Sequence, residues 1–132
     1  MAIQKGNQMR YSKQRAAILE IVQLNPVHPS ADWVYEQARK TVPNISLGTV
    51  YRNLNQLVET KALQAFRYNN VIHYDGNIEN HSHFICDFCN QIFDLYHSHE
   101  EVISNLNKIS NHRITGGQFQ MTGICENCKV VN

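Results

Sequence analysis

The sequence predicts an α+β protein, in which an N-terminal winged helix-turn-helix domain is followed by a small αβ domain with a four-cysteine zinc site. Three helix-forming segments precede a hairpin signal in the first half, and two Cys-x2-Cys pairs lie in the second half. The charge also changes sign along the chain. Residues 1–70 hold nine Lys/Arg and four Asp/Glu, for a net charge of +5, whereas residues 71–132 hold three and seven, for −4. This pattern indicates a basic module followed by an acidic one.

The composition bounds the class of protein. The chain has 132 residues, of which 42% are hydrophobic and 17% charged, which fits one ordinary domain or two very small ones and excludes a disordered or collagen-like chain. It has no run of 18 apolar residues, so we expect no membrane span. The first residues lack an apolar signal-peptide core, so we expect a cytoplasmic protein.

Two helices are predicted before residue 44. Ser12 is the expected N-cap of the first, which ends at Asn25-Pro26 because the residue before proline disfavours the helical conformation. Its apolar positions recur at helical spacing, namely Ala17, Ile18, Ile21 and Val22. The second begins near Ser30 and closes at Pro43. Its apolar side consists of Trp33, Val34, Ala38 and Val42.

Ser46 is the expected N-cap of a third helix, which is followed by a hairpin. The buried stripe of this helix consists of Leu47, Val50, Leu54, Leu57 and Val58. Two β-rich runs then flank Asn69-Asn70, and asparagine tolerates the left-handed conformation of a tight turn. Three helices followed by a hairpin predict a winged helix-turn-helix, whose last helix enters the major groove of DNA.

The exposed side of the third helix carries the predicted DNA contacts. Arg52 suits guanine or a phosphate, and Tyr51 suits a thymine methyl group or a phosphate. Arg67 lies in the hairpin, where a wing contacts the DNA backbone. The full set of predicted contacts is Lys13, Arg15, Thr49, Tyr51, Arg52, Asn55 and Arg67. A small helical domain with solvated charges is the alternative, but the excess of +5 favours double-stranded DNA as partner.

The four cysteines predict a structural zinc site. Cys86-x2-Cys89 and Cys125-x2-Cys128 supply four thiolates, and disulfides are rare in the cytosol. The 35 residues between the pairs are expected to form a strand at IFDLY, a helix carrying Val102, Ile103, Leu106 and Ile109, and a strand at RITGGQFQMTGIC. Redox-active pairs are the alternative, but neither pair opens a helix in a βαβ unit.

A second set of metal-ligand residues lies around the first cysteine pair. His81 and His83 would point to the same side of a strand, and Asp75 and Asp94 lie nearby in sequence. Nitrogen and oxygen ligands suit Fe(II), Mn(II) or Zn(II). Histidine pairs without any metal are the alternative.

Taken together, five motifs make residues 10–130 resemble the ferric uptake regulator family of metal-dependent repressors. The motifs are HPSAD (28–32), SLGTVYRNL (46–54), HYD (73–75), HSHFICDFC (81–89) and GICENC (123–128). The resemblance implies a regulatory metal site formed by His28, Asp75, His81, His83 and Asp94, beside structural zinc on Cys86, Cys89, Cys125 and Cys128.

The resemblance also implies a domain organisation and a mechanism. Residues 1–74 would form the winged-helix DNA-binding domain, 75–80 a hinge, and 81–132 a metal-binding dimerisation domain. Metal would fix the angle between the domains of a homodimer that binds a palindromic DNA operator.

Three positions resemble the peroxide-sensing branch of the family. That branch has aspartate at the positions of Asp75 and Asp94, where the iron-sensing branch typically has glutamate. The iron-sensing branch often has histidine at the position of Ile124. The resemblance implies Fe2+ or Mn2+ as regulatory metal and hydrogen peroxide as the signal, which oxidises His28 or His81 and releases the repressor from DNA. Iron sensing, and sensing of zinc or another signal, stay open.

Other classes are less well supported. A zinc-dependent enzyme needs an open metal position and a general base, and no HExxH or Ser-His-Asp pattern occurs. We therefore expect no enzyme. A metal-storage protein would not need the basic helix face. Four histidines have no required role, namely His73, His97, His99 and His112. A minor site is the alternative for His97 and His99, for which a solvated loop is favoured.

Overall fold

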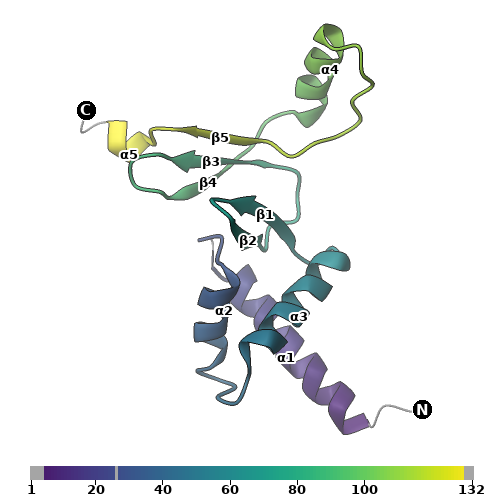
Figure 1. Cartoon of the computed structure of the whole chain (residues 1–132), viewed down its shortest axis with the longest axis vertical. Coiled ribbons are helices and arrows are strands. Elements are labelled where there is room, and N and C mark those ends of the chain that lie inside the picture. The colour runs from purple at the N-terminus through teal and green to yellow at the C-terminus, as the bar shows by residue number, and fades with distance from the viewer. Residues whose placement is uncertain (1–4, 26, 130–132) are drawn as a thin grey trace. The chain divides into compact units, whose positions relative to one another are not determined.

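The computed structural model divides the chain into two compact units, residues 1–78 and 79–132 (Figure 1). The structure describes residues 5–25 and 27–129, with only the backbone considered for residues 5–12. Pro26 therefore lies outside the described residues. No helix among the described residues is both long enough and apolar enough to cross a membrane.

The first unit packs three helices against one another and adds a hairpin. The helices are α1 (Lys5–Gln23), α2 (Ala31–Ala38) and α3 (Leu47–Glu59), and each contacts the other two. Their apolar faces form one core, whose members include Ile18, Val22, Val34, Val50, Leu54 and Leu57. The hairpin consists of β1 (Gln64–Tyr68) and β2 (Val71–Asp75), as Figure 1 shows.

Local sequence signals set most of the boundaries in this unit. Ser30 caps α2 by accepting a hydrogen bond from Trp33 N, and Ser46 caps α3 by accepting one from Thr49 N. Asn69 and Asn70 both have positive φ, at 51° and 62°, which a two-residue hairpin turn of this type requires. The start of the second helix near Ser30, the N-cap Ser46 and the hairpin turn are confirmed.

Three local expectations are wrong. α1 begins at Lys5, so Ser12 lies inside the helix and is not its N-cap. α2 ends at Ala38 rather than Pro43, although Val42 beyond its end still packs against the core. Leu47 is 36% exposed because it occupies the first turn of α3, before the helix reaches the core.

The second unit is a three-stranded sheet with two helices. Its strands are β3 (Ser82–Cys86), β4 (Ile92–Leu95) and β5 (Gln120–Gly123), in the order β4-β3-β5. β3 pairs antiparallel with β4 and parallel with β5. α4 (His99–Ile109) follows β4, and α5 (Glu126–Lys129) follows β5. The strand expected over RITGGQFQMTGIC is therefore limited to four residues.

Little of this unit is buried. Ile85, Cys86 and Ser82 are fully buried in β3, whereas neither α4 nor β5 contains a buried residue. Ile109 of α4 is 83% exposed. A core this small gives little stability by burial alone, so the unit needs a metal, a partner or both.

Candidate metal centres and nucleic-acid interface

Strand pairing brings the two cysteine pairs together. Cys86 ends β3, and the parallel register places it beside Gly123, two residues before Cys125. A tight turn follows Cys86, in which Asn90 has a φ of 62° and donates its backbone N–H to Cys86 O at 2.9 Å. Cys128 lies on α5, whose first turn begins after Cys125. The parallel pairing of β3 with β5 therefore brings the two cysteine pairs together, although 35 residues separate them in sequence.

The geometry of the four thiols fits tetrahedral zinc. All four Sγ atoms lie within 4.8 Å of one another, and Cys89 Sγ lies 3.8 Å from Cys125 Sγ. Four sulfurs, each about 2.3 Å from a tetrahedral zinc ion, would lie about 3.8 Å apart. No cysteine is in a disulfide. The residues present therefore fit Zn2+, which needs all four as thiolates.

The pKa values of the thiols indicate why four thiolates need a cation. Burial raises the pKa of Cys86, but backbone N–H groups of Cys89, Cys125 and Phe88 donate to its sulfur and lower the pKa to about 6. The side chain of Cys125 and burial raise the pKa of Cys128 to about 12. The low pKa of Cys86 favours a thiolate there, whereas a thiolate at Cys128 needs a neutralising cation.

In the second unit, three predicted ligands gather at one end of the sheet. His81 Nε2 lies 3.1 Å from His83 Nε2 and 3.3 Å from Asp94 Oδ1. His83 Nε2 lies 3.7 Å from the same carboxylate oxygen. Two donors about 2.1 Å from one metal lie about 3.0–3.4 Å apart at ordinary ligand angles. The spacing of these three atoms fits a shared metal ion.

The tautomer of His81 supports this arrangement. Its Nδ1–H donates to the carbonyl oxygen of Glu79 at 2.7 Å, which leaves Nε2 with its lone pair toward His83 and Asp94. Metal-binding histidines commonly donate their second ring N–H in this way. His81 precedes β3 by one residue, so it reaches the ligand cluster from the end of the strand.

In the first unit, the other two predicted ligands, His28 and Asp75, lie close to each other. His28 Nε2 lies 3.5 Å from Asp75 Oδ2, while the other oxygen of Asp75 accepts the backbone N–H of Asn77 at 2.9 Å. His28 lies just before α2 in the left-handed conformation, with φ of 54°. The pair supplies one nitrogen and one oxygen donor at a spacing that one metal ion can use.

The predicted DNA contacts are distributed over α1, α3 and the hairpin. On α3, Tyr51, Arg52 and Asn55 are exposed and Thr49 is partly buried. Arg52 donates to Thr49 Oγ1 at 3.0 Å. Lys13 and Arg67 are exposed as well. Arg15 donates to Asn53 Oδ1 at 3.3 Å and to Gln56 Oε1 at 2.5 Å, so it also links α1 to α3.

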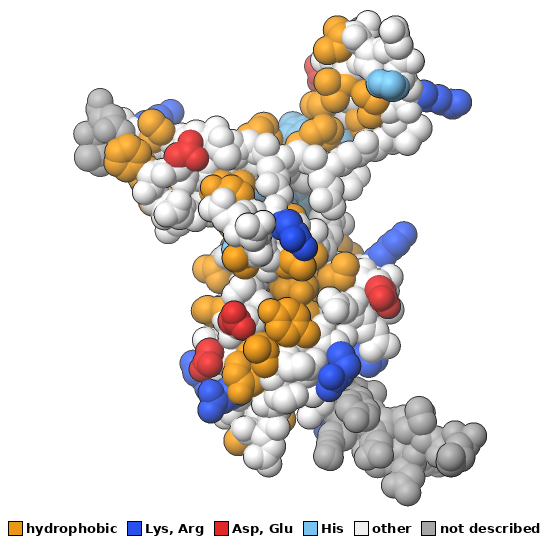
Figure 2. Space-filling model, viewed as in Figure 1, with side chains coloured by type: hydrophobic (Ala, Val, Ile, Leu, Met, Phe, Trp, Pro, Cys, Tyr) orange, Lys and Arg blue, Asp and Glu red, His pale blue; other side chains and the backbone are white. Residues whose placement is uncertain are grey.

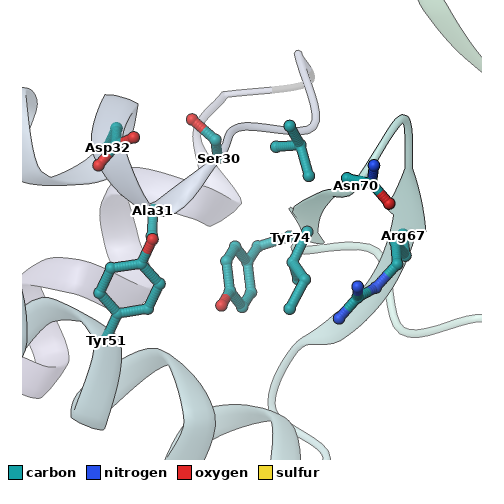
Figure 3. Close-up of a pocket in the computed structure, with 9 residues that line it drawn as sticks. Ser30, Ala31, Asp32, Tyr51, Arg67, Asn70 and Tyr74 are labelled. Atoms are coloured by element: carbon teal, nitrogen blue, oxygen red, sulfur yellow. The ribbon is translucent and has the colours of Figure 1, made fainter.

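A cavity of about 280 Å³ lies between the start of α2, α3 and the hairpin. Figure 3 shows Tyr51 from α3 and Arg67 from the hairpin facing this cavity, with Tyr74 between them. Burial, followed by the nearby Tyr51, raises the pKa of Tyr74. Sequence reasoning did not single out Tyr74 or Ser30 as lining residues, because strand periodicity does not indicate which helix faces the strand.

Two histidines outside both ligand sets pack against other rings, contrary to the solvated loop that was expected. His97 and His99 stack with ring centroids 4.5 Å apart, and both contact Phe119. Ser82 Oγ lies 2.5 Å from His97 Nε2. His73, which also had no assigned role, contacts the backbone of His28.

Comparison with known proteins identifies the family. The family model described as ferric uptake regulator family matches residues 6–122. A peroxide-responsive repressor PerR from Staphylococcus saprophyticus is 28% identical over 127 residues, which cover 95% of this chain and 86% of the relative. The solved structure of the Campylobacter jejuni peroxide stress regulator is 30% identical, with a TM-score of 0.75 and coverage of 94% of this chain and 95% of that one. A zinc uptake regulator complexed with zinc and DNA shares the fold, at 22% identity, a TM-score of 0.68 and coverage of 89% and 82%.

The winged-helix unit and the four-cysteine centre define a metal-binding transcriptional regulator. The chain belongs to the ferric uptake regulator family. Members of this family are transcriptional regulators and not enzymes, so the expected absence of enzymatic activity is confirmed by membership. Regulators of the family bind DNA and act as dimers.

Proposed function

We propose that this chain is a dimeric, metal-dependent repressor that leaves its DNA operator when hydrogen peroxide oxidises a metal-ligand histidine. The cluster of His81, His83 and Asp94 is the observation that carries the proposal, because its donor atoms have the spacing of a metal site. Its carboxylate is an aspartate, as in the peroxide-sensing branch that the sequence resembles. The named relatives that respond to peroxide support the same proposal.

The regulatory metal would join the two units. We infer that His28 and Asp75 from the first unit bind the same ion as His81, His83 and Asp94 from the second. Residues 75–80 would then act as a hinge, because the boundary between the units falls inside this segment. The first unit offers only two of these five ligands, and an ion shared by all five would hold the units at a fixed angle.

The angle controls DNA binding by a population shift. Two recognition helices of a dimer must lie about one helical turn, roughly 34 Å, or a multiple apart to read a palindromic operator. Shifting the closed form from about 1% to about 99% requires about 5.5 kcal/mol of differential metal binding. By linkage, the operator must tighten metal binding by the same factor that metal tightens operator binding.

Dimerisation would use the exposed apolar residues of the second unit. The exposed large apolar residues there include Leu95, Tyr96, Ile109 and Met121, and Figure 2 shows apolar side chains on the surface over α4. A homodimer interface that covers such residues supplies the burial that this unit lacks alone.

Oxidation would act on the ligand imidazoles. Fe2+ held by these ligands would supply the chemistry that splits the O–O bond of hydrogen peroxide. In the net reaction one peroxide oxygen adds to an imidazole carbon, the other oxygen leaves as water, and iron is not consumed. His28 and His81 are the candidate acceptors of the added oxygen atom, and either would become a poorer ligand. The two units would then be free to separate, and the DNA-binding angle would be lost.

Asp75, Asp94 and Ile124 favour peroxide sensing over iron sensing. The iron-responsive regulator is the second candidate, because the same five ligands can bind Fe2+ reversibly without oxidation. The four-cysteine centre is assigned to structural Zn2+ in both cases, and Mn2+ would support DNA binding without peroxide sensitivity.

The test uses full-length, zinc-containing protein loaded anaerobically with Fe2+ or Mn2+. One equivalent of hydrogen peroxide is added, and peptide mass spectrometry maps the added oxygen. Binding to a palindromic duplex, selected from random DNA with the Mn2+-loaded protein, is measured in parallel.

Oxygen on the His28 or His81 peptide of the Fe2+-loaded protein alone, with loss of DNA binding, is the expected result. An unmodified protein in which both metals still support DNA binding would indicate an iron sensor instead. No effect of either metal on DNA binding would overturn metal-dependent repression altogether.

A further inference from the structure

We propose that His73 is a positioning residue that holds the His28 metal ligand in its binding conformation. This inference rests on the proposed function, because it assumes that His28 binds the regulatory metal. His73 has no role in the ligand set itself. The argument comes entirely from contacts within the first unit.

The backbone of His28 needs support. Its φ of 54° places it in the left-handed region, which only a few per cent of residues other than glycine adopt, although histidine is among the types that adopt it most often. This conformation sets the direction in which the imidazole leaves the chain just before α2. A neighbour that fixes the peptide therefore also fixes the ligand.

His73 supplies such a contact. Its Nδ1 lies 2.8 Å from the carbonyl oxygen of His28. A carbonyl oxygen can only accept, so Nδ1 carries the proton and donates it. The contact joins residues that are 45 positions apart in sequence, and it anchors the left-handed peptide to strand β2.

The ring of His73 is itself held in place. His73 pairs with Phe66 in the antiparallel register of β1 and β2, and their rings stack with centroids 5.4 Å apart at an interplanar angle of 19°. Phe66 also meets the His28 ring, in an edge-on contact at 5.8 Å. Phe66 therefore touches both the positioning residue and the ligand.

A second hydrogen bond reinforces the attachment. Tyr74 donates its backbone N–H to Pro29 O at 2.8 Å, and Ser30 forms an isolated β-bridge with His73. The turn at 28–30 is thus tied to β2 by a single β-bridge and one further backbone hydrogen bond. Asp75 is the last residue of β2. The strand therefore carries the ligand Asp75 and also holds the peptide of the ligand His28.

The variants separate the hydrogen bond from the stacking. His73→Phe keeps a ring against Phe66 and removes the donor. His73→Asn keeps an N–H donor close to the position of Nδ1 and removes the ring. His112→Phe is the matched control, because His112 is an exposed histidine of the other unit. Zinc content and thermal unfolding are measured for every variant.

The measurement is Mn2+ affinity of the zinc-containing full-length protein. His73→Phe is expected to weaken Mn2+ binding by about tenfold to a hundredfold, the usual effect of removing a partner that orients a ligand. His73→Asn should recover most of this loss, and His112→Phe should match the original protein. At saturating Mn2+, operator affinity of His73→Phe should return, because the residue acts through the metal.

A double variant tests whether His73 acts through His28. If it does, adding His73→Phe to His28→Ala should weaken Mn2+ binding no further. Unchanged affinity in His73→Phe, or full additivity in the double variant, would overturn the proposal. If His73→Phe does not fold, the Mn2+ affinities of His73→Asn and His73→Gln are compared instead. Only asparagine places its N–H near the position of Nδ1, so equal affinities of these two variants would refute the proposal. An original protein without any Mn2+ binding would instead refute the proposed regulatory site.

Discussion

His83 and Asp94 lie directly opposite each other in the antiparallel register of β3 and β4, with His83 Nε2 3.7 Å from Asp94 Oδ1. Residues opposite each other in such a pair project to the same face of the sheet. The two ligands are therefore placed by strand pairing, and His81 joins them through its own contact with Asp94. The aspartate is the position at which the length of the side chain can be changed without altering its charge.

Asp94→Glu should retain metal-dependent DNA binding and reduce sensitivity to peroxide. The longer carboxylate still offers oxygen to the metal but changes its position relative to the two imidazoles. The measurement is the fraction of Fe2+-loaded protein that carries added oxygen on the His28 and His81 peptides after one equivalent of peroxide. Asp94→Asn is the control for lost charge. Loss of Mn2+-dependent DNA binding in Asp94→Glu would show that this assignment of the ligand is too simple.

Arg52→Ala should weaken operator binding by about 1–3 kcal/mol, the usual contribution of an arginine that reads a base. Arg52 is exposed on α3 and is oriented by its hydrogen bond to Thr49. Mn2+ affinity in the absence of DNA should stay the same. Fluorescence anisotropy with a labelled operator gives the first quantity. Arg39→Ala removes an exposed arginine at the end of α2 and serves as the control; equal losses in both variants would place the reading residue elsewhere.

Cys86→Ser should remove zinc and unfold the second unit. Cys86 is fully buried, and its sulfur accepts hydrogen bonds from the backbone N–H groups of Phe88, Cys89 and Cys125. The sulfur therefore contacts both Cys-x2-Cys segments. Structural zinc contributes about 10–16 kcal/mol of apparent binding free energy, which this small core cannot replace. Zinc content and circular dichroism measure the loss. The control is Phe88→Ser, which changes an exposed residue of the same Cys-x2-Cys segment. Loss of zinc in this control as well would argue against a specific role of Cys86.

Gly76→Ala should lower the free energy of unfolding of the first unit. A Cβ at this position would lie 2.8 Å from Gln23 Cα and 3.2 Å from Gln23 N, both backbone atoms of α1. Overpacking of this kind costs about 1–3 kcal/mol. Urea denaturation followed by Trp33 fluorescence measures it. Gly116→Ala is the control, because its Cβ would meet no atom within 4 Å. An equal loss of stability in both variants would mean that the contact with Gln23 is not responsible.

Local sequence features determined much of the first unit. The caps Ser30 and Ser46, the hairpin at Asn69-Asn70 and the apolar spacing in α3 all depend on residues a few positions apart. Such interactions form in nearly the same way in any surrounding structure, so periodicity and capping rules find them. The start of α1 was not found, because a serine inside a helix looks the same in sequence as a serine that caps one.

The metal-ligand residues were also visible as residue types. Two Cys-x2-Cys pairs and His81-Ser82-His83 indicate metal binding from spacing alone. His28 came only from the resemblance to the family, because a single histidine in a turn carries no local signal.

The tertiary structure decided which of these groups meet. The sequence by itself determined the ligand types, the basic face and the order of helices and hairpin, since these follow from residue chemistry and short spacing. Parallel pairing of β3 with β5 brought Cys86 beside the second cysteine pair, and β2 brought His73 to the carbonyl of His28 across 45 residues. Contacts over such separations depend on the packing of the whole unit, which no short pattern of residues specifies.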